Sequence, residues 1–159
     1  MQTGHDGSKD FDFFIGRWKA HSRRLRERLK NSNDWEELEG VAVIRVVLGG
    51  IGNIDEITME RDGARLQGLT LRLYNPESRQ WSMYWSSNAD GILQAPLVGS
   101  FADGSGEFYS QELFEGRSIL CRMTCSDITE TSCRWEQAFS TDGGKTWETN
   151  WIAELTRQE

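Results

Sequence analysis

The chain has 159 residues, a formal net charge of -7, 37% hydrophobic residues and 27% charged residues. This length predicts one domain that can bury a core without metal or disulfides, and the acidic balance disfavours nucleic acids and membranes as partners. The polar N-terminus and the lack of any run of about 20 apolar residues argue against a signal peptide or a membrane helix. We therefore expect a cytoplasmic protein with a flexible tail over residues 1–10 and one domain over residues 11–159.

The composition points to a β protein, because seven Trp and seven Phe stand beside sixteen Gly and only two Pro. Large aromatic side chains in segments punctuated by glycine are typical of strands that line a packed interior. The sequence has no repeat with a period of about 20 to 50 residues, which argues against a propeller or a solenoid. The segment FDFFIGRW (11–18) is apolar and contains Gly16, and we expect a short helical turn or a bend there, ahead of the first strand.

Residues 19–33 allow two interpretations. Leu25 and Leu29 lie four apart among good helix formers, which indicates a helix, whereas a strand would place His21 on one face with both leucines. The next segment, residues 35–50, becomes rich in β-branched residues after the polar turn sequence NSND. We therefore favour a strand that turns back along the next one.

The rest of the chain reads as a succession of short strands. Turn sequences such as Asp-Gly and NPESRQ divide residues 52–87, and within this segment Trp81, Met83 and Trp85 alternate with Ser and Tyr residues. Four further runs follow before a closing strand near the C-terminus. Strands and turns at this spacing indicate a mainly β chain of about eight to ten antiparallel strands, arranged as a barrel or a sandwich.

One hairpin can be aligned from the sequence alone. If Cys125 faces Cys133 across the turn that joins them, Arg122 faces Glu136, and opposite charges are then paired across the two strands. This alignment assumes a hairpin without a bulge. It predicts that Arg122 and Glu136 lie directly opposite each other.

The segment STDGGKTW (140–147) resembles the Asp-box of sialidases and other glycan-handling proteins. Sialidases carry several copies on a much longer propeller, together with an arginine cluster, a nucleophilic tyrosine and acidic catalysts, whereas this chain has one copy and three Tyr. We therefore interpret the segment as a structural turn rather than a glycosidase site. In such a turn the Asp142 carboxylate accepts hydrogen bonds from backbone amides and Trp147 packs beneath the loop, so both should matter for folding.

The three cysteines, Cys121, Cys125 and Cys133, form no C-x-x-C pair and have no histidine near them in the sequence. A metal site is therefore not expected, and no cofactor is predicted. No base stands beside any of these thiols to activate it as a nucleophile. We expect buried, reduced cysteines, although Cys125 and Cys133 would be close enough to oxidise if they are cross-strand neighbours.

Arginines within apolar strand runs supply the candidate ligand-binding residues. An arginine that faces a barrel interior must be ion-paired or must await an anionic ligand, because burial of an isolated charge is costly. The acceptors available as partners are Asp55, Glu56, Glu136 and Gln137. A polar pocket beneath an aromatic lining of Trp81, Trp85, Trp135 and Trp151 is the alternative use. The candidate ligand-binding residues are His21, Arg45, Arg72, Trp81, Trp85, Arg122, Gln137 and Trp151.

Four segments carry a resemblance that covers almost the entire chain: FDFFIGRW, GGIGNIDE, GSFADGSGEF and RWEQAFSTDGGKTWETNW. In this order they resemble a group of small bacterial proteins of unassigned function related to the lipocalin and calycin barrels. The resemblance implies an antiparallel barrel with a cavity for a small ligand. Relatives of that group include fatty-acid carriers and nitrobindin-type haem proteins. Haem ligation from a late strand is not expected, because no histidine follows His21.

Three hypotheses for function follow. The first is a small-molecule binding barrel for a partly apolar molecule, which the arginines would also allow to be anionic. The second is an enzyme that transfers protons in the cavity, with His21 acting beside an arginine and a carboxylate. The third is a structural or self-associating protein whose barrel is filled by its own side chains. A homodimer is compatible with each of them.

Overall fold

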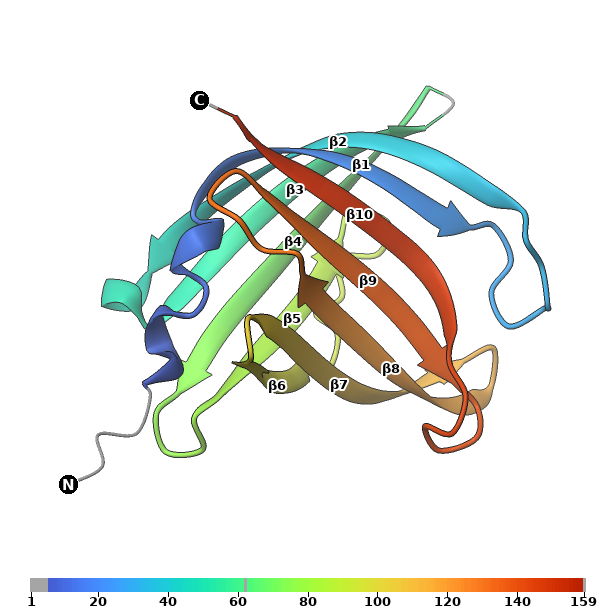
Figure 1. Ribbon diagram of the computed structural model, residues 1–159. Coiled ribbons are helices and arrows are strands. Elements are labelled where there is room, and N and C mark those ends of the chain that lie inside the picture. Colours follow the sequence, from blue (N-terminus) through green and yellow to red (C-terminus); the bar gives the residue numbers. More distant parts are fainter. Residues whose placement is uncertain (1–5, 62, 159) are drawn as a thin grey trace.

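The computed structural model describes residues 6–61 and 63–158 and confirms the expected fold, a closed antiparallel β-barrel (Figure 1). Ten strands follow one another around the barrel in chain order, and β10 closes it by pairing with β1. The strands are β1 (Gly16–Leu25), β2 (Trp35–Val47), β3 (Gly52–Arg61), β4 (Ala64–Asn75), β5 (Gln80–Ser87), β6 (Leu97–Ala102), β7 (Ser105–Phe114), β8 (Arg117–Ser126), β9 (Ser132–Ser140) and β10 (Glu148–Gln158). Three short 3-10 turns accompany them, η1 (Gly7–Lys9), η2 (Asp12–Phe14) and η3 (Leu48–Gly50). Over the described residues, the chain contains no helix with the length and apolarity that a membrane crossing requires.

The barrel wall follows the two-residue period of a strand. In β1, Trp18 and Ala20 are buried, whereas Arg17 and Lys19 between and beside them are exposed. Successive side chains of a strand point to opposite faces of the sheet, so one set fills the barrel and the other meets solvent. This parity decides which residues of each strand can reach the interior.

The N-terminal segment closes one end of the barrel, where β1 begins (Figure 1). The backbone N–H of Gly7 donates to the Tyr74 hydroxyl at 3.1 Å, and the Gly7 carbonyl accepts from Trp81 Nε1 at 3.0 Å. The tail expected over residues 1–10 includes Gly7, which these buried hydrogen bonds join to the barrel. The remainder of that expected tail, residues 1–5, lies outside the described residues.

An aromatic cluster fills the closed end. Phe11 is buried and meets the Trp81 ring edge-on at 4.9 Å and the Trp135 ring in a stacked arrangement at 6.1 Å. Phe14 packs on Trp18, whose indole N–H donates to the Phe14 carbonyl at 2.9 Å. The helical turn expected in residues 11–18 is thus present as η2, and it inserts the two phenylalanines into the barrel.

The two interpretations of residues 19–33 are resolved in favour of a strand. β1 continues to Leu25, and residues 26–34 form the loop to β2. Leu29 and Asn31 in this loop have φ angles of 61° and 55°, in the left-handed region that a right-handed helix cannot contain. The loop is longer than the NSND turn that the sequence suggested.

The expected alignment of the β8–β9 hairpin is wrong by two residues. Cys125 pairs with Trp135, and Arg122 pairs with Ala138 instead of Glu136. The loop is asymmetric, because the Thr129 amide and hydroxyl bind Ser132 in a tight turn. Cys133 therefore lies beyond the end of β8.

A shift of two residues preserves the parity of the strand, so Cys125 and Cys133 still face the same side of the sheet. Both are buried free thiols, as is Cys121. A hydrogen bond with the Cys133 thiol and burial both raise the pKa of Cys125 well above its usual value.

The loop between β9 and β10 has the structural role predicted for it. Asp142 Oδ1 accepts hydrogen bonds from the backbone amides of Lys145 at 3.0 Å and Thr146 at 2.9 Å. The Trp147 indole N–H donates to the Gly144 carbonyl at 3.2 Å and folds the ring back onto the loop. These hydrogen bonds join groups of the same loop, which is the arrangement of a stable turn.

Candidate functional site

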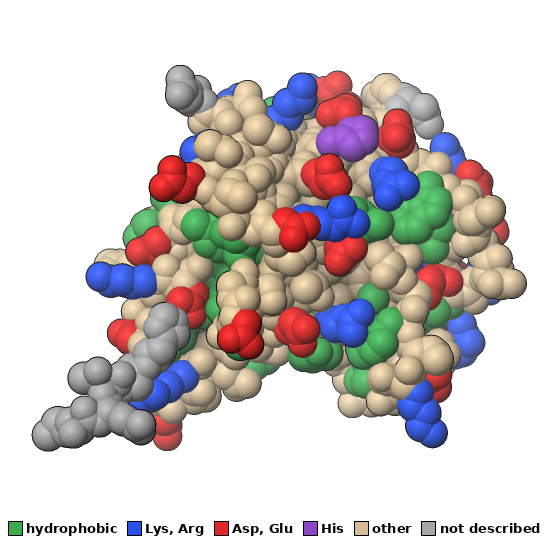
Figure 2. Space-filling view, in the orientation of Figure 1, with side chains coloured by type: hydrophobic (Ala, Val, Ile, Leu, Met, Phe, Trp, Pro, Cys, Tyr) green, Lys and Arg blue, Asp and Glu red, His purple; other side chains and the backbone are tan. Residues whose placement is uncertain are grey.

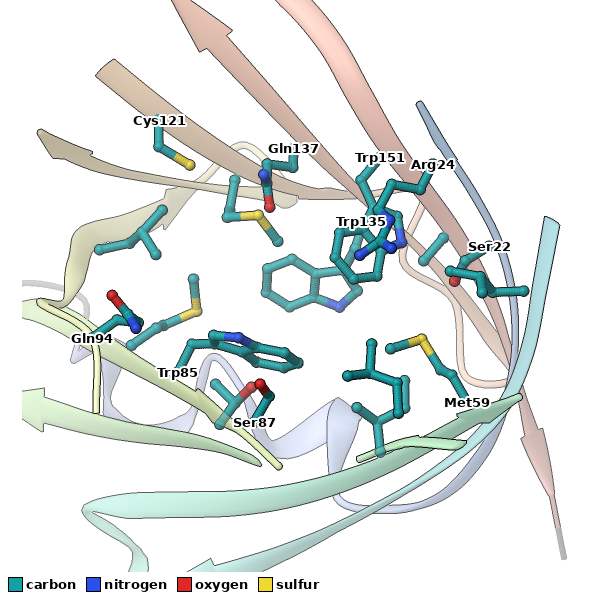
Figure 3. Close-up of a pocket in the computed structure, with 18 of the residues that line it drawn as sticks. Ser22, Arg24, Met59, Trp85, Ser87, Gln94, Cys121, Trp135, Gln137 and Trp151 are labelled. Atoms are coloured by element: carbon teal, nitrogen blue, oxygen red, sulfur yellow. The ribbon is translucent and has the colours of Figure 1, made fainter. Parts of the chain in front are cut away.

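The barrel encloses a cavity of about 810 Å³ between the aromatic closed end and the opposite, open end (Figure 3). Ligand sites in proteins commonly measure about 300 to 1,000 Å³. Figure 3 shows Trp85, Trp135, Trp151 and Met59 around the central space, with polar atoms of a few side chains between them. The cavity therefore has the size and the mixed lining of a small-molecule site.

The floor of the cavity contains a buried ion pair. Arg72 on β4 and Asp55 on β3 are both buried, with Arg72 Nη2 2.6 Å from Asp55 Oδ2. Arg72 Nη1 also donates to Asn53 Oδ1 at 3.0 Å, and the guanidinium lies 5.3 Å from the centre of the Phe11 ring and 5.1 Å from that of Phe14. Arg72 thus joins the barrel wall to the N-terminal segment, and Asp55 is one of the acidic partners that the sequence offered.

The side walls are apolar and aromatic. Trp85 lies flat across the neighbouring strand at Gly68, where a Cβ atom would stand 2.0 Å from the indole ring. A residue with any side chain at position 68 would push the indole away from the wall. Three methionines complete this lining, Met59, Met83 and Met123.

Part of the wall is a loop rather than a strand. β5 and β6 pair over only three residues each, because the pairing of Met83 with Leu97 is the last one towards the open end. Beyond it, residues 88–96 continue the wall, and the Gln94 amide donates to the Trp85 carbonyl at 2.8 Å. Gln94 lines the cavity beside Trp85 (Figure 3).

The open end carries a cluster of arginines around one carboxylate. Glu36 on β2 is 3% exposed and accepts from Arg24 at 3.0 Å and Arg61 at 2.8 Å, while Arg26 lies 3.4 Å away. Burial alone would raise the pKa of Glu36, but the hydrogen bonds from Arg61 and Arg24 outweigh burial and hold this pKa below its usual value. Arg24 also lies over the Trp151 ring at 5.1 Å, so it connects the charged rim to the aromatic wall.

Cys121 lines the cavity near the open end, but its chemistry is not that of a nucleophile. Burial and the neighbouring Glu112 carboxylate raise the pKa of this thiol far above its usual value, so it stays protonated. Glu112 itself accepts a hydrogen bond from the Ser110 hydroxyl at 2.6 Å. The group is a polar patch on the wall of a mostly apolar cavity.

Four of the sequence-predicted site residues line the cavity, Arg72, Trp85, Gln137 and Trp151. Trp81 does not, because it is 1% exposed in the aromatic core of the closed end. Trp135, which the sequence placed in the aromatic lining, does face the cavity.

The other three predicted site residues lie outside the barrel, contrary to expectation. His21 is exposed on the outer face of β1, hydrogen-bonded to Glu39 and 3.8 Å from Glu37, and Figure 2 shows the histidine at the surface among acidic side chains. Arg45 is exposed on β2, and the Arg122 guanidinium lies 4.3 Å from the centre of the Trp147 ring. Strand parity explains all three positions, since the neighbouring residues of each point inward.

The location of His21 removes the proton-transfer mechanism that was based on it. A general base must come within about 3 Å of the proton that it abstracts, or act through one water molecule, and the wall of β1 separates His21 from the cavity. The arrangement inside the barrel offers shape, aromatic surface and arginine donors.

Sequence reasoning missed Arg24 and Arg28, which line the open end. The sequence did contain a signal for Arg24. Trp18, Ala20 and Ser22 are buried at every second position of β1, and Arg24 is the next residue on this inward face. Arg28 lies in the loop 26–34, where strand parity no longer applies. Both arginines lie in a charged segment whose composition also fits a helix, so their position at the cavity could not be predicted from it.

No family model matches the sequence, and no curated protein matches it. Among solved structures, an S-type phycobiliprotein lyase, CPES, from Guillardia theta is similar with a TM-score of 0.65 and 13% identity, over 98% of this chain and 94% of that one. The protein EF1p2_mFAP2b, bound to DFHBI, has a TM-score of 0.53 and 10% identity over 96% and 99% of the two chains. A redesigned β barrel, b11L5F_LGL, has a TM-score of 0.52 and 9% identity, over 99% of this chain and 100% of that one. These likenesses agree with the fold of this chain, a closed antiparallel β-barrel of ten strands.

Proposed function

We propose that this protein binds a small, partly apolar organic molecule inside its barrel. The observation that carries the proposal is the cavity of about 810 Å³ inside the barrel, open at one end, whose walls include Trp85, Trp135 and Trp151 together with methionines. Transfer of apolar surface from water into such a site contributes roughly 25 cal/mol for each Å² buried. Flat aromatic walls also favour ring-containing ligands through stacking.

The similar solved structures support this proposal at the level of the architecture. One of them is bound to a small molecule, DFHBI, and another is a phycobiliprotein lyase. The cavity itself disfavours the alternative of a filled barrel, because side chains that packed the interior to native density would leave no space of this size.

The test is a titration with 1-aminoanthracene, a neutral flat fluorophore whose emission rises in an apolar site. The blocking variant is Ala153→Trp, because Ala153 on β10 lines the cavity and a larger side chain there would occupy it. The matched control is Ile152→Trp, the same new side chain one residue away, on the outer face of the same strand.

We expect saturable binding to the unaltered protein and to Ile152→Trp, and a loss of at least about tenfold in affinity for Ala153→Trp, since overpacking opposes occupancy of the same space. Thermal unfolding of each variant confirms that it is folded. Equal binding by all three proteins would place the probe outside the cavity and would contradict the proposal.

A further inference from the structure

The open end of the cavity contains an arginine that forms no ion pair with any of the described residues. Arg28 lies in the loop 26–34 between β1 and β2, lines the cavity and is half-buried. Its guanidinium lies 4.9 Å from the centre of the Phe114 ring and 5.5 Å from that of Phe139. Across residues 6–61 and 63–158, it forms no ion pair and no hydrogen bond with a carboxylate.

The carboxylates nearest to Arg28 are already engaged elsewhere. The Glu112 carboxylate accepts a hydrogen bond from the Ser110 hydroxyl, and Glu115 forms an ion pair with Lys30 at 3.3 Å. Burial lowers the pKa of Arg28, and the like charge of Arg24 lowers it further. Together they outweigh the attraction of the Glu112 and Glu115 carboxylates, so the folded protein holds this cation at a cost. A cation that is partly removed from water and makes no direct ion pair is a position where an incoming anion gains much.

Arg24 has a free donor at the same end of the cavity. Its Nε and Nη2 both donate to Glu36 Oε1, at 3.1 and 3.0 Å. Its Nη1 makes no hydrogen bond within the described part of the chain. Glu36 also accepts a hydrogen bond from Arg61, so a single buried carboxylate is shared by two guanidinium groups that line the cavity. Around Glu36 the guanidinium groups therefore outnumber the carboxylate that they share, although the protein as a whole is acidic.

Directly below this rim the wall is apolar. Ile119, Phe139 and Phe114 pack together beside Arg28, and Trp151 lies under Arg24. A molecule that enters the cavity thus meets guanidinium donors at the rim and hydrophobic surface beneath them.

We propose that Arg28, together with Nη1 of Arg24, binds the carboxylate of an organic acid whose apolar body fills the cavity towards Trp85 and Trp135. A planar carboxylate matches the fork of a guanidinium, which can donate two parallel hydrogen bonds to it. This inference rests on the proposed function and extends it, since it assigns the chemical class of the ligand and its orientation, with the acid at the open end.

The experiment compares two probes that share one body, 1-pyrenebutyrate and 1-pyrenebutanol. Energy transfer from the tryptophans of the cavity wall to pyrene reports binding of either. The variants are Arg28→Gln and Arg28→Met, the second of which keeps an apolar stem over the phenylalanine rings. The matched control is Arg23→Gln on the outer face of β1, where Arg23 is exposed and lies over Trp35.

We expect the unaltered protein and Arg23→Gln to bind 1-pyrenebutyrate more tightly than 1-pyrenebutanol. Both Arg28 variants should lose about 10- to 100-fold in affinity for the acid, the range expected for hydrogen bonds to a charged group, and should keep their affinity for the alcohol. Equal binding of both probes by the unaltered protein, or an equal loss of both in the Arg28 variants, would overturn the carboxylate site and leave binding in the cavity intact. If neither probe binds, both proposals are wrong.

Discussion

The two ends of this barrel are built in opposite ways. At the closed end, aromatic rings pack against one another, and the Arg72 guanidinium is paired with Asp55 and lies beside the rings of Phe11 and Phe14. Of its three nitrogens, Nη1 and Nη2 are bound by Asn53 and Asp55, and Nε has no hydrogen-bond partner among the described residues. At the open end, arginines outnumber the carboxylates that they contact, and the half-buried Arg28 lacks an ionic partner among the described residues.

This difference in pairing suggests that the closed end contributes to the stability of the fold and the open end to ligand binding. A charge that is paired within the protein contributes to folding and gains less from a ligand than an unpaired charge does. Donors left free beside an apolar cavity contribute little to folding, but they are available to a ligand. Substitutions at the closed end should therefore change the free energy of unfolding, whereas substitutions at the open end should change binding.

The largest expected loss of stability comes from Phe11→Ala. Phe11 is 1% exposed and contacts the rings of Trp81, Phe101, Phe108 and Trp135, so its removal should lower the free energy of unfolding by about 3–5 kcal/mol. The control is Leu113→Ala at the open end, where the side chain is 80% exposed and the change should stay within about 0.5 kcal/mol. Denaturant unfolding measures both. Similar losses of unfolding free energy in the two variants would contradict the proposed difference between the closed and the open end.

A loss of similar size is expected when the ion pair of the closed end is broken. Asp55→Ala leaves the Arg72 cation buried without its carboxylate, which should cost about 3 kcal/mol or more. The exposed pair of Glu60 with Arg65, at 3.2 Å near the open end, is the matched control, and Glu60→Ala should cost less than about 1 kcal/mol. If Asp55→Ala unfolds at the same denaturant concentration as the unaltered protein, Arg72 is not held as described.

Gly68→Ala should affect both stability and binding. The new Cβ would meet the Trp85 indole at 2.0 Å, so we expect about 1–3 kcal/mol of destabilisation and weaker binding of 1-aminoanthracene as the ring moves into the cavity. Adding Trp85→Ala should restore much of the lost stability, because the clash is removed. Purely additive losses in the double variant would show that Trp85 does not lie against Gly68.

The smallest effect is a dependence on pH in the β9–β10 loop at the open end. Hydrogen bonds from the Thr146 side chain and backbone, and from Ser140, lower the pKa of Asp142 to about 2 from an ordinary value of 3.8. Because the folded state favours the carboxylate, this contribution to stability is complete above about pH 4 and is lost as the pH falls towards 2. Unfolding curves of the unaltered protein and Asp142→Asn should therefore converge over that interval. A constant difference between them would contradict the assigned hydrogen bonds.

Much of the fold could be predicted from the sequence, because alternation and turn residues report directly on strands. The alternation of Trp81, Met83 and Trp85 predicted a strand that is present as β5, and Asp142 lies in the turn expected of it. The register of the β8–β9 hairpin could not be predicted, since the asymmetric turn of Thr129 with Ser132 shifts the pairing by two residues without changing the parity of either strand.

The site was harder to predict, because parity shows which residues share a face but not which face is inside. His21 and Arg45 were assigned to the interior, although the buried residues Trp18 and Ala20 on β1, and Ile44 on β2, lie on the other face of each strand. Arg28 could not be found in this way, since it reaches the cavity from a loop.

The central claim, that a small molecule enters the barrel, is tested most directly by the methionine methyl groups. Met59, Met83 and Met123 line the cavity on three different strands. In protein labelled with carbon-13 at these methyls, addition of 1-aminoanthracene should shift all three signals and show contacts between the probe and the methyl protons, and Ala153→Trp should abolish both effects. If the three methionine signals stay unchanged while the probe binds, the ligand site lies outside the barrel.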